Sequence, residues 1–215
     1  MSKYNNKKYE DAVENIGLWK SEKIIFNKYL NKEDKLLDIG CGTGRVTISL
    51  FKEGYINIVG LDIEEEFIKY AKNINKDIPF YCESILNTHF EDNIFNNAIF
   101  SFNGLMTLSK ENQIKALNEI SRILKNDGYF IFTTYDYLSY SGEKELSKQL
   151  INNNTGLTLY IPTIEEIKEL IKKSNFKLIE YCNRKEIVEE NELVKEFSGD
   201  DKEINTIFWI VKNNK

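Results

Sequence analysis

The chain contains 215 residues, of which 41% are hydrophobic and 29% are charged, so it can enclose one sizeable core but is too short for two ordinary domains with linkers. A formal net charge of −5, with lysines spread among acids, argues against a large nucleic-acid-binding surface. No apolar run is long enough to cross a bilayer, and the polar segment 1–11 is unlike a signal peptide. We therefore expect a single cytoplasmic domain over residues 1–215 with no membrane partner, and the charge disfavours a nucleic-acid partner.

The apolar pattern predicts strands and helices in alternation, which is typical of a parallel sheet covered on both faces. In chain order we expect helix 17–30, strand 35–39, a helix after residue 45, strand 57–63, helix 64–74, strand 77–81, a fourth strand ending near residue 102, helix 109–125 and strand 129–134. An irregular or extended insertion is expected over 135–161. A helix then begins near Pro162, where Thr163 and Glu166 have capping-box spacing, and strands follow at 176–182 and 206–211.

A glycine-rich turn follows the first predicted strand, where residues 36–45 read LLDIGCGTGR. Gly40, Gly42 and Gly44 stand at alternate positions, and a helical pattern begins directly after them. Such a turn lets backbone approach a ligand closely and directs free N–H groups outward. The dinucleotide fingerprint G-x-G-x-x-G does not fit, because the third glycine comes one residue early and position 45 is Arg. The turn therefore predicts a small-molecule site of another kind.

This segment closely resembles the first motif of the class I S-adenosylmethionine (AdoMet)-dependent methyltransferases. Specific motifs carry the resemblance over residues 36–134, and topology alone carries it beyond them. It implies a three-layer, Rossmann-like α/β fold, with a mostly parallel seven-stranded sheet whose last strand is antiparallel, and AdoMet as the cofactor. Asp62 supports this interpretation, because an acid about 20 residues after the turn can hydrogen-bond ribose hydroxyls.

The resemblance also assigns cofactor contacts to the segments that follow each strand. The acid of the first strand organises the methionine end, Asp62 binds the ribose and Ile63 lies against the adenine. Glu83 accepts a hydrogen bond from the exocyclic amine, and a backbone N–H of Ser84 or Ile85 donates to the ring. Asn96 stands where the family usually has an Asp. The complete expected set of cofactor-binding residues is Asp38, Gly40, Cys41, Gly42, Gly44, Arg45, Asp62, Ile63, Glu83, Ser84, Ile85, Ser101 and Phe102.

The acceptor side of the site has no recognisable motif. Residues 101–105 follow the fourth strand and should face the reacting methyl group, because ligands bind beyond the carboxyl ends of parallel strands. Residues 1–34 are expected to form a helical cap, and the segment before residue 17 and the insertion 135–161 are expected to form a mobile lid. The candidate acceptor residues are Tyr9, Trp19, Asn103, Tyr135 and Tyr137.

We expect methyl transfer to a small-molecule acceptor by in-line displacement, in which alignment of the reactants supplies most of the acceleration. A base is needed only if the acceptor must lose a proton, and Asp136, Tyr135 and His89 are equivalent candidates for it. Three widely spaced cysteines and the absence of a carboxylate cluster predict no metal. A protein or RNA methyltransferase and a non-catalytic AdoMet-binding domain remain as alternatives. No feature of the sequence identifies the acceptor, a catalytic residue or an oligomeric state.

Overall fold

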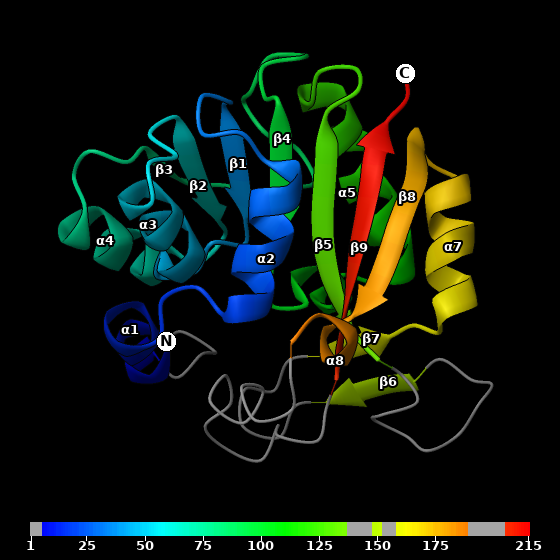
Figure 1. Cartoon of the computed structure of the whole chain (residues 1–215), viewed down its shortest axis with the longest axis horizontal. Coiled ribbons are helices and arrows are strands. Elements are labelled where there is room, and N and C mark those ends of the chain that lie inside the picture. The colour runs from blue at the N-terminus through cyan, green and yellow to red at the C-terminus, as the bar shows by residue number, and fades with distance from the viewer. Residues whose placement is uncertain (1–5, 137–147, 152–157, 189–204) are drawn as a thin grey trace.

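The computed structural model describes residues 6–136, 148–151, 158–188 and 205–215. Seven strands form one sheet in the order β3-β2-β1-β4-β5-β9-β8 (Figure 1). The strands are β1 (Leu36–Ile39), β2 (Ile58–Asp62), β3 (Phe80–Cys82), β4 (Asn97–Phe100), β5 (Tyr129–Tyr135), β8 (Phe176–Asn183) and β9 (Thr206–Asn213). The first five strands pair in parallel, whereas β9 is antiparallel to both of its neighbours. The expected sheet, including its antiparallel last strand, is therefore confirmed.

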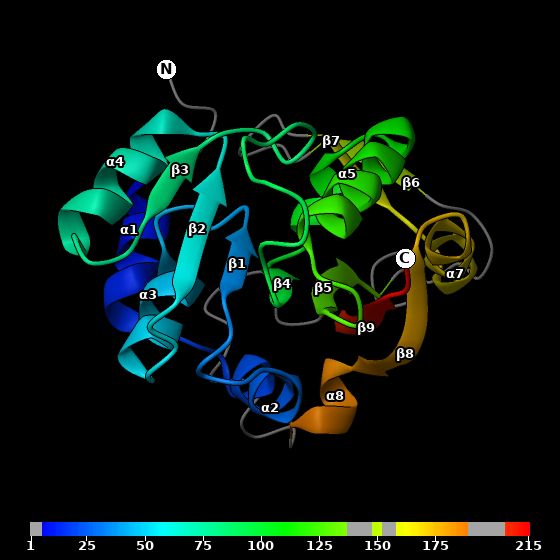
Figure 2. The ribbon, with the colours of Figure 1, turned by 90° about the horizontal axis from the view of Figure 1, so that it is seen from above.

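Helices cover both faces of this sheet, as Figure 2 shows from above. They are α1 (Asn6–Asn15), α2 (Lys20–Tyr29), α3 (Arg45–Lys52), α4 (Glu65–Ile74), the 3-10 helix η1 (Gly104–Thr107), α5 (Lys110–Ile123), α7 (Ile164–Lys172) and α8 (Arg184–Ile187). Apolar side chains of α2, α3 and α4 pack against one face, and those of α5 and α7 pack against the other. Alternate residues of β1 supply both cores, Leu36 to the first and Leu37 to the second.

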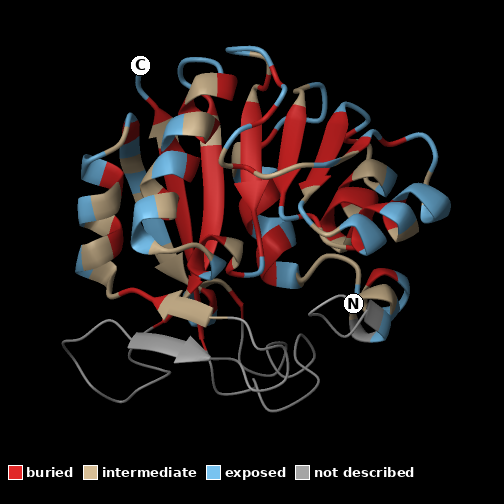
Figure 3. Ribbon diagram, turned by 180° about the vertical axis from the view of Figure 1, so that it is seen from behind, coloured by how far each residue is buried: buried red, intermediate tan, exposed pale blue. Residues whose placement is uncertain are grey.

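The central strands are buried on both sides, as Figure 3 shows. This explains why β1 and β4 are apolar apart from Asp38 and Asn97 and show no alternating pattern. No helix among the described residues is long and apolar enough to cross a membrane.

The N-terminal region differs from the expected single helix over 17–30, because it contains two helices, α1 and α2. Gly17 has a φ of 65°, and the N–H groups of Ile16 and Gly17 both donate to the carbonyl of Ala12, at 3.1 and 3.4 Å. A glycine in the left-handed conformation ends a helix by satisfying its last carbonyls. Gly17 therefore closes α1, and α2 begins three residues later.

The insertion 135–161, which we expected to be irregular or extended, is extended over residues 148–151 and 158–161. It contains β6 (Lys148–Ile151) and β7 (Thr158–Ile161), which pair as an antiparallel hairpin. Ile161 packs with Met106 and Tyr135, so β7 is attached to η1 and to the end of β5. The predicted capping box is confirmed, since the Thr163 hydroxyl accepts from the Glu166 N–H at 3.2 Å and the Thr163 N–H donates to Glu166 at 2.9 Å.

Candidate active site

The glycine turn joins the carboxyl end of β1 to the first residue of α3. Gly40, Gly42 and Gly44 have φ angles of 62°, 56° and 93°, which non-glycine residues rarely adopt. A Cβ atom at position 40 would also lie 2.6 Å from the ring of Phe100. The turn therefore requires glycine, and it brings the N-terminus of α3 to the carboxyl end of β1.

Asp62 is fixed beside this turn at the end of β2. Its Oδ2 accepts the Gly42 N–H at 2.7 Å, and its Oδ1 accepts the Glu64 N–H at 2.9 Å. Burial raises the pKa of Asp62, while these backbone donors oppose the shift. Each carboxylate oxygen can accept a further hydrogen bond, so the group is suited to bind the two hydroxyls of a ribose.

Asp38 lies in a different environment, at the end of β1 and almost completely buried. The Thr47 hydroxyl of α3 donates to its Oδ2 at 2.6 Å. Burial raises the pKa of Asp38 to about 7, although this hydrogen bond and the charge of Arg45 oppose the shift. The backbone N–H of Cys41 donates to Leu61 at 3.0 Å, which ties the turn to β2. These contacts fix the turn against α3 and β2.

The expected adenine-binding residues follow two paired strands. The Glu83 N–H donates to the carbonyl of Asp62 at 3.0 Å, so the segments after β2 and β3 leave the sheet together. The Ile63 side chain is 66% exposed. The Ser84 hydroxyl accepts the Leu86 N–H at 3.2 Å, and the Ile85 side chain belongs to the core. The structure thus places an apolar side chain and a carboxylate close to Asp62.

The acceptor side begins where β4 ends, two residues earlier than expected. Phe102 and Asn103 both take left-handed backbone conformations, with φ angles of 55° and 60°. Such strain at non-glycine residues persists only where the surroundings impose it, and here the Asn103 N–H donates to the Thr133 hydroxyl at 2.8 Å. The Oδ1 atom of Asn103 is buried and has no hydrogen-bond partner among the described residues. Phe102 is 48% exposed, and the Ser101 carbonyl accepts the Gly104 N–H at 3.3 Å.

Arg45 takes part in a buried ion pair that the sequence did not indicate. Its two terminal nitrogens contact the Glu22 carboxylate at 2.7 and 2.6 Å, and one of them also donates to the Gly17 carbonyl at 2.7 Å. The guanidinium carbon lies 4.5 Å from the ring of Trp19, whose centroid is 5.5 Å from that of Phe102. Arg45 is therefore directed toward α2, and it fixes Trp19 beside the end of β4.

The remaining acceptor candidates are distributed around the same end of the sheet. The Tyr9 carbonyl accepts the hydroxyl of Thr43 at 2.8 Å, which places α1 against the glycine turn. Tyr135 packs near η1, and Asp136 accepts from the Asn183 side chain at 3.1 Å. Tyr137 lies outside the described residues. A cavity of about 600 Å³ lies between α5, α7 and β7, but none of the expected site residues lines it.

Comparison with known proteins gives an independent identification. A family model described as a methyltransferase domain matches residues 37–132. An uncharacterized protein of Methanocaldococcus jannaschii is 32% identical over 189 residues, which cover 84% of this chain and 71% of that protein. The phosphoethanolamine N-methyltransferase of Plasmodium falciparum is 26% identical over 78% of this chain and 63% of its own length.

Solved structures share the fold at low sequence identity. A SAM-dependent methyltransferase from Methanosarcina mazei superposes with a TM-score of 0.72 and 20% identity, covering 93% of this chain and 99% of that one. The 1,6-didemethyltoxoflavin-N1-methyltransferase of Burkholderia thailandensis, solved with its substrate and S-adenosylhomocysteine, has a TM-score of 0.69 and 15% identity, covering 98% of this chain and 82% of that one. The solved structures share the fold, and the methyltransferase family model together with the 32%-identical relative shows that the chain belongs to the class I AdoMet-dependent methyltransferases.

Proposed function

We propose that this AdoMet-dependent methyltransferase acts on a small-molecule acceptor. The observation that carries the proposal is that the chain's own elements cover the carboxyl edge of the sheet. In Figure 1, α1 lies below the glycine-turn end of the sheet, and the hairpin β6–β7 lies below β5 and β9. Tyr9 joins α1 to the turn, and Ile161 joins the hairpin to η1. An edge covered in this way is suited to enclosing a small acceptor rather than to docking a large one.

The residues of this edge divide into a cofactor side and an acceptor side. AdoMet, when bound, supplies an electrophilic methyl group. We assign its ribose to Asp62, its adenine to Ile63 and Glu83, and its methionine end to the turn above Asp38. Phe102 and the unpartnered Oδ1 of Asn103 would then meet the acceptor, where the amide oxygen can orient an N–H or O–H group. These residues would act by alignment, which is the main requirement of an in-line displacement.

Two relatives support a small acceptor. The Plasmodium protein is named for methylating phosphoethanolamine, and the Burkholderia structure contains 1,6-didemethyltoxoflavin. All three cysteines of this chain are free thiols, which supports the cytoplasm as its compartment.

The test is to incubate the protein with methyl-labelled AdoMet and with separated small-molecule, protein and RNA fractions of a cell extract. We expect the label to enter the small-molecule fraction, and an Asp62→Ala variant to lose this transfer. Label in the protein or RNA fraction instead would refute the proposal. Binding of S-adenosylhomocysteine without transfer to any fraction would indicate a non-catalytic AdoMet-binding domain.

A further inference from the structure

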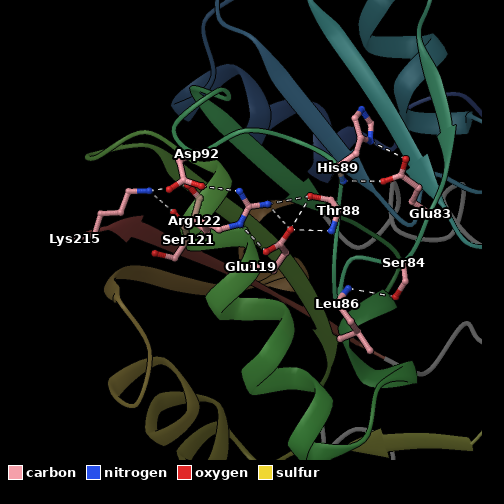
Figure 4. A network of polar contacts seen from close by, with 10 residues as sticks. All are labelled: Glu83, Ser84, Leu86, Thr88, His89, Asp92, Glu119, Ser121, Arg122 and Lys215. Atoms are coloured by element: carbon pink, nitrogen blue, oxygen red, sulfur yellow. Dashed lines mark hydrogen bonds and ion pairs between the residues drawn. The ribbon is translucent and has the colours of Figure 1, made fainter.

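The loop that carries Glu83 is attached to α5 by hydrogen bonds. This loop runs from the end of β3 to the start of β4, and Figure 4 shows its polar contacts. Glu119 of α5 accepts two hydrogen bonds on its Oε1 from Thr88, one from the backbone N–H at 2.9 Å and one from the hydroxyl at 2.7 Å. Thr88 is buried, so this carboxylate fixes both the backbone and the side chain of one loop residue.

Arg122, one helical turn later on α5, holds the Glu119 carboxylate in place. Its Nε and Nη2 donate to Glu119 at 2.8 and 2.7 Å, while its Nη1 donates to Asp92 at 2.6 Å. The hydrogen bond from Arg122 is the largest effect on the pKa of Glu119, which falls to about 2. Glu119 therefore stays ionised at physiological pH, and its geometry is set by a bidentate contact within the helix.

His89, the residue after Thr88, contacts Glu83 and so links it to the fixed part of the loop. The backbone N–H of His89 donates to Glu83 Oε2 at 3.1 Å, and the His89 Nδ1 lies 2.6 Å from Glu83 Oε1. Two successive backbone N–H groups thus bind two different carboxylates, one on α5 and one at the end of β3. Each oxygen of Glu83 keeps room for another donor, because a carboxylate can accept about four hydrogen bonds.

We propose that Glu119 is a positioning residue for adenine recognition, which clamps Thr88 so that His89 orients the Glu83 carboxylate toward the exocyclic amine of the cofactor. The inference rests on the proposed role of Glu83. Neither Glu119 nor Thr88 is among the residues that the sequence suggested for the site, and in the structure they are linked to Glu83 only through the loop. The chain of contacts runs from Arg122 through Glu119, Thr88 and His89 to Glu83 (Figure 4).

The test measures base discrimination rather than affinity alone. The probes are S-adenosylhomocysteine and its purine analogue, in which hydrogen replaces the exocyclic amine, and both are titrated calorimetrically. We expect the parent protein to prefer S-adenosylhomocysteine by about tenfold or more, since the analogue leaves Glu83 without its donor. Glu119→Gln and Thr88→Val should each reduce this preference to about twofold, mainly by weakening the binding of S-adenosylhomocysteine.

Glu111→Gln is the matched control, because Glu111 lies on the same helix and, among the described residues, pairs only with Lys115, one turn away at the surface. It should keep the parent's preference, and thermal unfolding should show that all variants are folded. The proposal would be overturned if Glu119→Gln and Thr88→Val weakened the binding of both ligands equally or left the preference unchanged. Failure of both variants to fold would overturn it as well. A parent that binds both ligands equally would overturn it too, by removing the role of Glu83. A parent that binds neither ligand would overturn the proposed function as well.

Discussion

The buried pair between Glu22 and Arg45 offers a sharp test of how the N-terminal helices are attached to the glycine turn. Glu22 is 1% exposed and Arg45 is 11% exposed, and they meet in a bidentate contact of 2.6 and 2.7 Å. Glu22 also accepts the Trp19 N–H at 2.9 Å. The change Glu22→Gln preserves the shape of the side chain and its ability to accept that bond. It removes the negative charge that balances a guanidinium in the interior, and it replaces the oxygen that accepts from Arg45 Nη2 with an amide NH2 donor.

The expected loss follows from the burial of the partner that remains. Removing one member of a buried ion pair costs about 3–5 kcal/mol, because the other charge stays desolvated and unpaired. For a domain of this size, such a loss lowers the melting temperature by roughly 6–20 °C. The double variant Glu22→Gln/Arg45→Met removes both charges, and it should lose about 0.5–3 kcal/mol less than the sum of the single changes.

The assay is urea unfolding of the parent, the two single variants and the double variant. Lys23→Met is the matched control, because Lys23 lies on the same helix and pairs with Glu53 at 2.6 Å in an exposed position. Its cost should stay below about 1 kcal/mol. If Glu22→Gln lowers the free energy of unfolding by no more than this control does, the Glu22–Arg45 pair is hydrated in solution. The pair would then not hold α2 against the glycine turn.

Three further predictions concern single polar groups. Asp62→Ala should weaken AdoMet binding by about 1–3 kcal/mol in calorimetry, because the ribose hydroxyls lose a charged acceptor, and unchanged affinity would show that Asp62 only organises its own turn. Burial raises the pKa of Asp38 to about 7, so the folded state holds its proton between about pH 4 and pH 7, where the unfolded state releases it. The contribution of Asp38 to stability should therefore fall as pH rises through this window, and Asp38→Asn should flatten that dependence in unfolding curves; equal pH slopes in both proteins would contradict this. Asn213→Ala should destabilise the fold by about 1–3 kcal/mol without changing AdoMet affinity, because the side-chain amide donates to the carbonyls of Ser121, Leu124 and Lys125 at the end of α5, and a change in affinity would show that this end of the helix reaches the site.

The cofactor side of the site could be predicted from the sequence because its signals are local. Each glycine of the turn is required by its own backbone conformation, and Asp62 stands at a fixed distance along one strand–helix–strand unit. The capping box at Thr163 is likewise contained within four residues. Gly17 is also a local signal, because a glycine that ends a helix takes the left-handed conformation. It marks the end of α1.

The contacts that the sequence did not reveal join residues far apart in the chain. Glu22 and Arg45 come from different helices, and Glu119 meets a loop residue 31 positions earlier. Charged residues are common throughout this sequence, so no pattern marks the few that become buried partners. The contacts of the acceptor side could not be predicted for the same reason. Trp19 and Phe102 are far apart in the sequence, and their rings meet only in the folded chain. Specificity in such a site depends on tertiary packing, for which periodicity carries no information.

The position of β9 has a consequence for the order in which the molecule can assemble. This strand follows every other described strand in the chain, yet it lies between β5 and β8 and is the only described neighbour of β8 in the sheet. During synthesis, β1 to β5 can pair as soon as they emerge, whereas β5 keeps an open edge and β8 has no place in the sheet until β9 is available. That open edge carries Phe130 and Phe132, which are completely buried in the finished fold. The nascent protein must therefore protect an apolar strand edge until the last strand arrives, and folding of the cofactor half and of the β8–β9 half should be separable in time.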